Sequence, residues 1–208
     1  MQPFTRVTGV AAPLDRPNVD TDQIIPKQFL KRIERSGYGP FLFFDWRYQG
    51  DGVTENPDFG LNREPWRHAP ILLAGRNFGC GSSREHAAWA LEDYGVRAVI
   101  APSFGDIFRT NALKIGLLPV TLPEEVVARW IDAATESPGL EATVDLESGL
   151  VELAGERWPI DIDEDARERL LGGLDDIALS LRHAGEIEAH EARRPAWLPR
   201  TTELVTAR

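Results

Sequence analysis

The chain alternates between short apolar runs and longer stretches in which apolar residues recur every three or four positions. Short runs bounded by Gly, Pro or polar residues are typical of buried strands, and the longer spacing is typical of amphipathic helices. The strands predicted in this way are residues 6–11, 71–74, 97–101 and 117–122. The predicted helices are residues 26–33, 87–94, 105–114 and 124–134. This alternation predicts an α/β domain.

A run of short strands replaces the alternation later in the chain. These strands are expected at residues 143–146, 150–153 and 158–162. Helices are expected to follow at residues 164–171 and 174–191, separated by Gly172 and Gly173. A strand–helix alternation followed by a β run predicts a three-layer β/β/α architecture.

The domain organisation is predicted to be simple. We expect one domain over residues 1–194 and an extended tail over residues 195–208. Within the domain, residues 37–67 are rich in Gly, Pro, Asn and Asp around a group of aromatic residues. That composition indicates an insertion loop with one short hydrophobic element, whose aromatic side chains serve packing or a contact between subunits.

The overall charge limits the classes of partner. The 208-residue chain has a net charge of −10, from 23 Lys and Arg against 33 Asp and Glu. Such an acidic protein is not expected to bind nucleic acid or an anionic membrane. No apolar run approaches the roughly 18 residues of a membrane span, and the first residues lack the pattern of a signal peptide. We therefore expect a soluble cytoplasmic protein.

A glycine-rich junction at residues 75–86 is the main candidate for chemistry. It lies between a predicted strand and a predicted helix, and its glycines let the backbone turn tightly and let another molecule approach. We expect Ser82 or Ser83 at the helix N-cap, with Arg84 and Glu85 in the first turn. A serine oxygen there faces unpaired N–H groups, the positive end of a helix dipole and a guanidinium. The pattern predicts a site for an anion, or for a serine that itself becomes one.

The junction does not match the common nucleotide or hydrolase motifs. Arg84 stands where the dinucleotide-binding fingerprint requires its third glycine. The chain also has no Gly-Lys-Ser/Thr phosphate loop and no Gly-x-Ser-x-Gly nucleophile elbow.

Three segments carry a resemblance to one family. Residues 77–86, Asn-Phe-Gly-Cys-Gly-Ser-Ser-Arg-Glu-His, resemble the signature of the swivelling domain of aconitase-type hydro-lyases. Within that group they look most like the family of bacterial 3-isopropylmalate dehydratase small subunits. Residues 18–26 resemble the N-terminal Thr-Asp loop of the family, and residues 103–119 resemble its downstream strand-helix-strand segment. The resemblance spans residues 5–122 and implies the aconitase-type swivelling fold.

The resemblance also implies an activity. It is the interconversion of 2-isopropylmalate and 3-isopropylmalate by dehydration and rehydration, in leucine biosynthesis. The reaction removes a proton beside a carboxylate and expels hydroxide from the neighbouring carbon. By resemblance, Ser82 is the base, acting as an alkoxide, and Arg84 stabilises that anion or pairs with a substrate carboxylate. Asp22 would orient Arg84 or a substrate group, and Ser83 would bind substrate or cap the helix.

Other positions are assigned more loosely by the same resemblance. Lys31 and Arg32 fall near a further substrate-binding arginine of aconitases. Ile25 replaces an aconitase serine, and the loss of that polar contact suits an isopropyl group better than citrate. His86 is expected to be a structural or supporting hydrogen-bonding residue rather than the base.

The cysteine content implies a partner. Cys80 is the only cysteine, whereas an aconitase-type [4Fe–4S] cluster requires several thiolates. The resemblance therefore places the cluster on a separate large subunit, with no metal or cofactor on this chain. The expected partners are that large subunit, in a heterodimer or larger assembly, and a small dicarboxylic acid substrate.

Two other interpretations stay open at this point. The small subunit of a related hydro-lyase for homoaconitate, citraconate or dimethylmaleate would carry the same signature, because substrate choice depends on the Thr-Asp loop and residues 30–32. A regulatory or assembly protein could instead use the glycine turn only to bind an anion.

Overall fold

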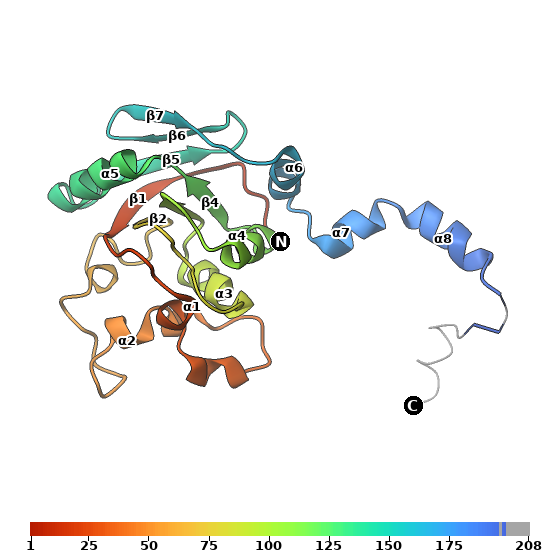
Figure 1. The fold of residues 1–208 in the computed structure, drawn as a ribbon, viewed down its shortest axis with the longest axis horizontal. Coiled ribbons are helices and arrows are strands. Elements are labelled where there is room, and N and C mark those ends of the chain that lie inside the picture. The colour runs from red at the N-terminus through yellow and green to blue at the C-terminus, as the bar shows by residue number, and fades with distance from the viewer. Residues whose placement is uncertain (196, 199–208) are drawn as a thin grey trace. The chain divides into compact units, whose positions relative to one another are not determined.

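Seven strands form one sheet in the order β4-β3-β2-β1-β5-β6-β7, with the long first strand at its centre (Figure 1). The strands are β1 (Arg6–Leu14), β2 (Ile71–Ala74), β3 (Ala98–Ala101), β4 (Leu118–Thr121), β5 (Glu141–Asp145), β6 (Leu150–Leu153) and β7 (Glu156–Pro159). Residues 6–10 of β1 pair antiparallel with β5, whereas residues 11–14 pair in parallel with β2. The first strand therefore joins a parallel part, β1 to β4, to an antiparallel part, β5 to β7.

Helices cover both faces of the parallel part. Two of them, α3 (Glu85–Tyr94) and α4 (Asp106–Ile115), each follow a parallel strand, and each ends at a glycine in the left-handed conformation. The amphipathic helix α5 (Glu124–Glu136) packs against β1, β2 and β3. The other helices up to residue 173 are α1 (Thr21–Ile24), α2 (Phe44–Arg47) and α6 (Glu164–Gly172), and the 3₁₀ turns η1 (Lys27–Lys31), η2 (Gly39–Phe41) and η3 (Gly60–Asn62).

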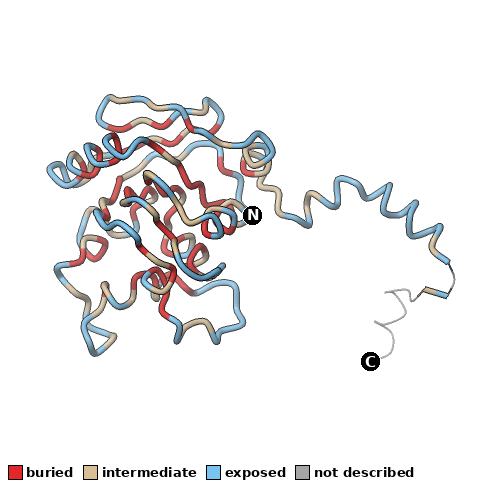
Figure 2. The backbone as a smooth tube through the Cα atoms, viewed as in Figure 1, coloured by how far each residue is buried: buried red, intermediate tan, exposed pale blue. Residues whose placement is uncertain are grey.

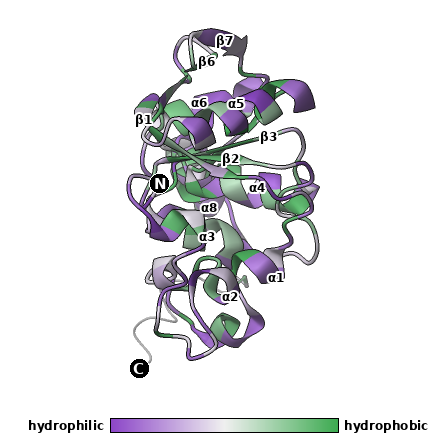
Figure 3. Cartoon of the chain, turned by 90° about the vertical axis from the view of Figure 1, so that its left-hand side faces the viewer, coloured by the Kyte–Doolittle hydropathy of each residue, from purple (hydrophilic) through white to green (hydrophobic). Residues whose placement is uncertain are grey.

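The alternation of side chains along the central strands divides the interior into two cores. Leu72 and Val99 lie in the core that includes buried residues of α3 and α4. Ile71 and Ile100 lie in the core that includes α5 and the antiparallel strands. Figure 2 shows buried residues along the central strands, and Figure 3 shows hydrophobic colouring there. The antiparallel strands, the parallel strands, and helices α3 and α4 thus form the three layers that the sequence predicts, and the α/β class is confirmed.

The structure is a computed structural model that describes residues 1–195 and 197–198. The chain divides into two compact units, Met1–Gly173 and Leu174–Arg208. The second unit contains α7 (Asp176–Leu181) and α8 (Ala184–Ala192), so the single helix predicted over residues 174–191 is wrong. The predicted domain boundary after residue 194 stays a prediction. Residues 196 and 199–208 of the predicted tail lie outside the described residues.

The strands and helices predicted between residues 6 and 171 are confirmed within a few residues, but two of these predictions are wrong. The predicted helix over residues 26–33 is only the 3₁₀ turn η1 at Lys27–Lys31, and Ile33 lies beyond it with 95% of its surface exposed. A segment that buries only part of its apolar side chains has little packing to hold an α-helix. The seventh strand lies at Glu156–Pro159 instead of residues 158–162, because a tight turn at Ala154 and Gly155 starts its pairing with β6 early.

The insertion at residues 37–67 has more local structure than predicted, with two 3₁₀ turns and a short helix in place of one hydrophobic element. Its aromatic side chains pack, as predicted: the buried Phe43 stacks on Trp46 with ring centroids 5.4 Å apart. A buried Arg47 donates to the side chain of Asn62 at 3.1 Å and to the Gly39 carbonyl at 3.2 Å. These bonds satisfy a buried charge and tie the two ends of the insertion together.

Candidate active site

Three loops meet at the carboxyl ends of β1, β2 and β3. The loop after β2 is bonded to the loop after β1, since Gly79 N donates to the Val19 carbonyl at 2.7 Å. It is bonded on its other side to the loop after β3, where Phe78 N donates to the Ser103 carbonyl at 3.0 Å and Gly105 N to the Phe78 carbonyl at 2.9 Å. Open α/β sheets place their ligand sites at this edge of the strands. The signature at residues 77–86 is thus held between both neighbouring loops.

The close approach of these loops requires glycine at two positions. A Cβ on Gly79, which has φ +74°, would lie 2.2 Å from Cγ of Phe108. A Cβ on Gly105 would lie 2.5 Å from the Gly79 carbonyl oxygen. No side chain fits at either distance, so these glycines are needed for the loops to touch.

The short helix α1 carries the Thr-Asp pair to the signature. Asp20 and Gln23 form a capping box around its first turn: the Asp20 carboxylate accepts from Gln23 N at 2.7 Å, and the Gln23 side chain accepts from Asp20 N at 2.9 Å. Next in the chain, Thr21 N donates to the Cys80 carbonyl at 2.9 Å. The Thr21 hydroxyl donates to the Ser82 carbonyl at 2.9 Å.

Asp22 and Arg84 form a bidentate ion pair across the two loops. Both terminal nitrogens of Arg84 donate to the Asp22 carboxylate, one of them at 3.0 Å. The Arg84 side chain is 10% exposed and that of Asp22 is 41% exposed. The hydrogen bonds from Arg84 hold the pKa of Asp22 below its ordinary value, and Lys27, 3.9 Å away, adds a smaller effect in the same direction. The pair leaves three N–H groups of the guanidinium for another anion.

The two serines lie on the surface ahead of α3. The N-cap is Arg84 rather than Ser82 or Ser83, and no side chain caps the helix, so the predicted serine cap is wrong. Both serines are exposed, because the chain leaves the Cys80 bridge through Gly81 at φ +94° and reaches helical geometry only at Glu85. Within the described part of the chain, neither serine hydroxyl has a hydrogen-bond partner. Each is therefore open to a ligand or a partner surface.

Lys31 is the last residue of η1 and Arg32 follows it, and both are exposed. The Arg32 guanidinium lies over the ring of Phe41 at 5.3 Å from its centroid and pairs with Glu34 at 3.6 Å. In the described residues, no hydrogen bond or ion pair joins Lys31 or Arg32 to the serines or to Arg84. The structure thus brings together Asp22, Ser82, Ser83 and Arg84 and leaves the other two predicted residues separate.

His86 is part of an aromatic contact. Its ring lies 5.3 Å from that of Tyr38 and 4.7 Å from that of Trp89. Burial lowers the pKa of His86, which favours the neutral imidazole. These contacts support the predicted structural role, because they join α3 to the insertion.

Two site neighbours were not singled out in the sequence. Thr21 belongs to the quoted Thr-Asp loop, but its buried side chain and its bond to Ser82 depend on how two distant segments meet. Lys27 approaches Asp22 through the turn at Pro26. The capping-box spacing of Asp20 and Gln23 was the available signal for α1.

Cys80 is the single cysteine of the chain, and burial raises the pKa of its thiol. In the described ranges, no group of three or more His, Cys, Asp or Glu side chains is arranged to hold a metal ion. The described residues also contain no helix long and apolar enough to cross a membrane.

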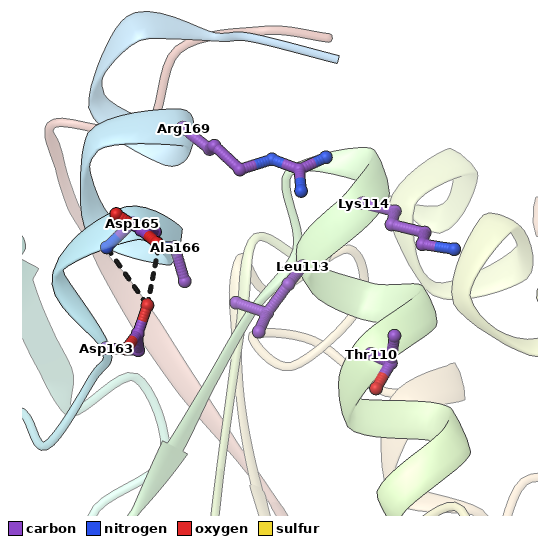
Figure 4. A pocket seen from close by; sticks show the side chains of 7 residues that line it. All are labelled: Thr110, Leu113, Lys114, Asp163, Asp165, Ala166 and Arg169. Carbon is purple, nitrogen blue, oxygen red and sulfur yellow. Dashed lines mark hydrogen bonds between the residues drawn. The ribbon is translucent and has the colours of Figure 1, made fainter. Parts of the chain in front are cut away.

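A hollow of about 220 Å³ lies elsewhere on the first unit, between α4 and α6 (Figure 4). Its lining comprises Thr110, Leu113, Lys114, Asp163, Asp165, Ala166 and Arg169. None of the residues predicted for the site lines this hollow, so it is separate from the serine surface.

Comparison with known proteins decides the family. The family model of the aconitase C-terminal domain matches residues 1–125, and that of the C-terminal domain of the 3-isopropylmalate dehydratase small subunit matches residues 176–202. A 3-isopropylmalate dehydratase small subunit of Methylibium petroleiphilum is 54% identical, over 97% of this chain and 99% of its own length. The chain belongs to the 3-isopropylmalate dehydratase small-subunit family.

Further relatives agree with this assignment. The small subunit of Rhodopirellula baltica is 56% identical over 93% of this chain and 100% of its own, and that of Bacillus pumilus is 55% identical over 95% and 99%. A crystal structure of 3-isopropylmalate dehydratase from Methanocaldococcus jannaschii superposes with a TM-score of 0.62 at 24% identity, covering 90% of this chain and 99% of that one. That superposition confirms the fold expected from the resemblance.

Proposed function

We propose that this small subunit, joined to a large subunit, interconverts 2-isopropylmalate and 3-isopropylmalate by dehydration and rehydration in leucine biosynthesis. The relatives named above are dehydratase small subunits and match nearly the whole chain. Their names favour this substrate over homoaconitate, citraconate or dimethylmaleate. The observation in the structure that carries the proposal is the exposed Ser82 beside the Asp22–Arg84 ion pair.

Ser82 is the proposed base. Its Oγ, as an alkoxide, takes the proton from the carbon beside a substrate carboxylate, and the resulting hydroxyl gives a proton back to substrate during rehydration. A free serine is too weak an acid for this role, so its anion needs a neighbouring cation and hydrogen-bond donors. Arg84, two residues away, supplies the charge, and the backbone N–H groups of residues 81–83 donate no hydrogen bond within the described chain. These groups are available to an anion at this surface.

Arg84 is also the proposed carboxylate anchor. A guanidinium held by Asp22 on its terminal nitrogens presents its remaining N–H groups in a fixed direction, which favours fork-like binding of a carboxylate. Ser83 would donate to the same substrate. Lys31 and Arg32 would reach substrate only after the segment bearing them closes over the serines or meets the large subunit.

The remaining chemistry is assigned to the large subunit. One cysteine does not fit a [4Fe–4S] cluster, so we place the cluster on the partner, where it would supply the Lewis acid for the departing hydroxyl. The small subunit would then contribute the base and the arginine on an open surface, and the partner would enclose it. A cytoplasmic location is part of the same proposal.

Co-expression with the large subunit of the same source tests the function. The complex is purified anaerobically, its cluster is reconstituted, and formation of the unsaturated acid is followed in the ultraviolet. Homoisocitrate and citramalate are offered beside 3-isopropylmalate, and each subunit alone is the control. We expect turnover of 3-isopropylmalate only with both chains present. Preference for another acid would assign the chain to a related hydro-lyase, and no turnover by an intact complex would favour the anion-binding interpretation.

A further inference from the structure

The backbone that carries the serines is held at a single point. Residues 81–83 lie between the bridge at Cys80 and the first turn of α3, and they belong to no strand or helix. Among the described residues, the only hydrogen bond that their backbone makes is the one accepted by the Ser82 carbonyl. A segment with so few bonds keeps one orientation only if that bond is maintained.

The donor of that bond is buried and is itself held by hydrogen bonds. The Thr21 hydroxyl donates to the Ser82 carbonyl at 2.9 Å, and Thr21 itself is 2% exposed. Its position is fixed by its own N–H, which donates to the Cys80 carbonyl, and by the capping box of Asp20 and Gln23 that forms α1. The next residue, Asp22, holds Arg84. Two consecutive residues of α1 therefore hold the signature on both sides of Ser83.

We propose that Thr21 is a positioning residue for Ser82: its hydroxyl fixes the peptide that carries the base, while Asp22 fixes the arginine beside it. The inference rests on the proposed function, since it assigns the purpose of a contact within that site. The Thr21 hydroxyl donates to the carbonyl of Ser82, so Thr21 would act through Ser82 and not on the reacting atoms.

Loss of the Thr21 hydroxyl would leave the backbone of residues 81–83 without a hydrogen bond to the described chain. Without the Thr21 hydroxyl, the Ser82 carbonyl is free to turn toward water, and Oγ of Ser82 samples several directions. Misplacement of a reacting group by about 1 Å costs roughly 10²-fold in rate. The substrate carboxylates would still bind Arg84, which Asp22 continues to hold, so KM should change little.

Three variants of the full small subunit test this in the reconstituted complex. Thr21→Val removes the hydroxyl with little change in shape, and Thr21→Ser keeps it. Thr135→Val is the matched control, because the Thr135 hydroxyl donates to the Ile131 carbonyl at 2.8 Å on α5, outside the site. We expect Thr21→Val to lower kcat by about 10²-fold with KM within about twofold, and the other two variants to stay within about threefold of wild type. Gel filtration reports assembly in each case.

If the wild-type complex is active and Thr21→Val leaves kcat unchanged, the inference is overturned. Equal losses in Thr21→Val and Thr21→Ser would overturn it as well, because the serine hydroxyl restores the bond. A measurement independent of activity is the ¹⁵N relaxation of residues 81–83 in the full small subunit. Their order parameters should fall in Thr21→Val and stay unchanged in Thr135→Val, and unchanged values in both would also overturn the inference. A wild-type complex that does not turn over 3-isopropylmalate would overturn the proposed function, and the relaxation data would still decide whether Thr21 holds Ser82.

Discussion

Single contacts between two loops determine how the polar side chains of the serine surface are arranged. Ser82 is exposed, whereas the arginine beside it is nine-tenths buried and charge-paired with Asp22. This combination leaves the hydroxyl of the proposed base exposed and holds a positive charge two residues away in the chain. The Arg84 charge is satisfied by its partner before any substrate arrives, and removing Asp22 would leave a largely buried charge unpaired.

Replacing Ser82 by Ala should abolish turnover, because the substitution removes the proposed base. Assembly should stay intact, because the Ser82 hydroxyl has no hydrogen-bond partner within the described chain. Turnover is measured in the reconstituted complex and assembly by gel filtration. Ser148→Ala, in the turn between β5 and β6, is the control and should keep wild-type activity. Retention of more than about a tenth of wild-type turnover by Ser82→Ala would remove it as the base.

The titration of Asp22 should report its bond with Arg84. Its pKa is lowered by the hydrogen bonds from Arg84, so ionised Asp22 favours the folded state above the unfolded value of about 3.9, and this contribution disappears as the pH falls through the folded pKa. The carboxylate is 41% exposed, so solvent screening keeps the effect on stability small and makes NMR the better measurement. We expect a ¹³C midpoint below about 3.9 in wild type, and a higher one in Arg84→Gln.

Arg76→Gln is the control for this titration. It removes an exposed ion pair with Glu124 and should leave the Asp22 midpoint unchanged. Equal midpoints in wild type and Arg84→Gln would contradict the ion pair as the cause of the lowered pKa.

The three loops at the carboxyl ends of β1, β2 and β3 act as one element. Backbone hydrogen bonds join each loop to its neighbour, and glycines allow the contact. The serines belong to one of these loops, so the packing of the loops fixes the positions of α1 and α3 relative to each other. A substitution that disturbs the packing of the three loops should therefore lower the stability of the fold as well as any activity.

Gly79→Ala should destabilise the chain by more than about 4 kcal/mol, since the added Cβ would lie 2.2 Å from a ring carbon of Phe108 at a backbone φ that disfavours side chains. Thermal denaturation followed by circular dichroism measures the loss. Gly50→Ala is the control, because no atom lies within 4 Å of the added Cβ, and it should change stability by less than about 1 kcal/mol. Equal melting temperatures for the two variants would contradict the close packing at Gly79.

The two units of the whole chain differ in how they are stabilised. Both hydrophobic cores lie within residues 1–173, from Phe4 to Leu170 among the buried members. The helices of the second unit bury no residue and expose Ile177, Leu181 and Ile187. Stability of the fold is therefore expected to come from the first unit, although the family model for the C-terminal domain of the small subunit matches residues of the second.

A chain ending at residue 173 should fold and melt cooperatively at nearly the wild-type temperature, because the truncation removes no core residue. A chain ending at residue 162 is the matched comparison. It loses α6 with the fully buried Leu170, whose carbonyl accepts from Phe4 N at 2.8 Å, and should lose about 2–5 kcal/mol. Loss of the cooperative transition in the longer of the two would show that the second unit is needed for folding.

The local pattern determined the strands, the main helices and the glycine junction. Side-chain periodicity and turn residues act over a few positions, so β2 and β6 were predicted with the observed bounds. Two segments that bury little apolar surface differ from the prediction. The segment after Pro26 became a 3₁₀ turn and residues 174–191 became two helices, because neither buries enough apolar surface to enforce a regular α-helix.

The sequence by itself determined the α/β class, the residue types of the site, and the resemblance through which its family and chemistry were inferred. Only the tertiary structure decided which of those residues meet. Asp22 and Arg84 are 62 positions apart, and Thr21 is 61 positions from Ser82, so no local signal reports either contact. The structure also moved the helix start to Glu85, leaving the serines exposed ahead of it. Parallel strands bring their carboxyl ends to one edge, and this long-range pairing joins the Thr-Asp loop to the serines.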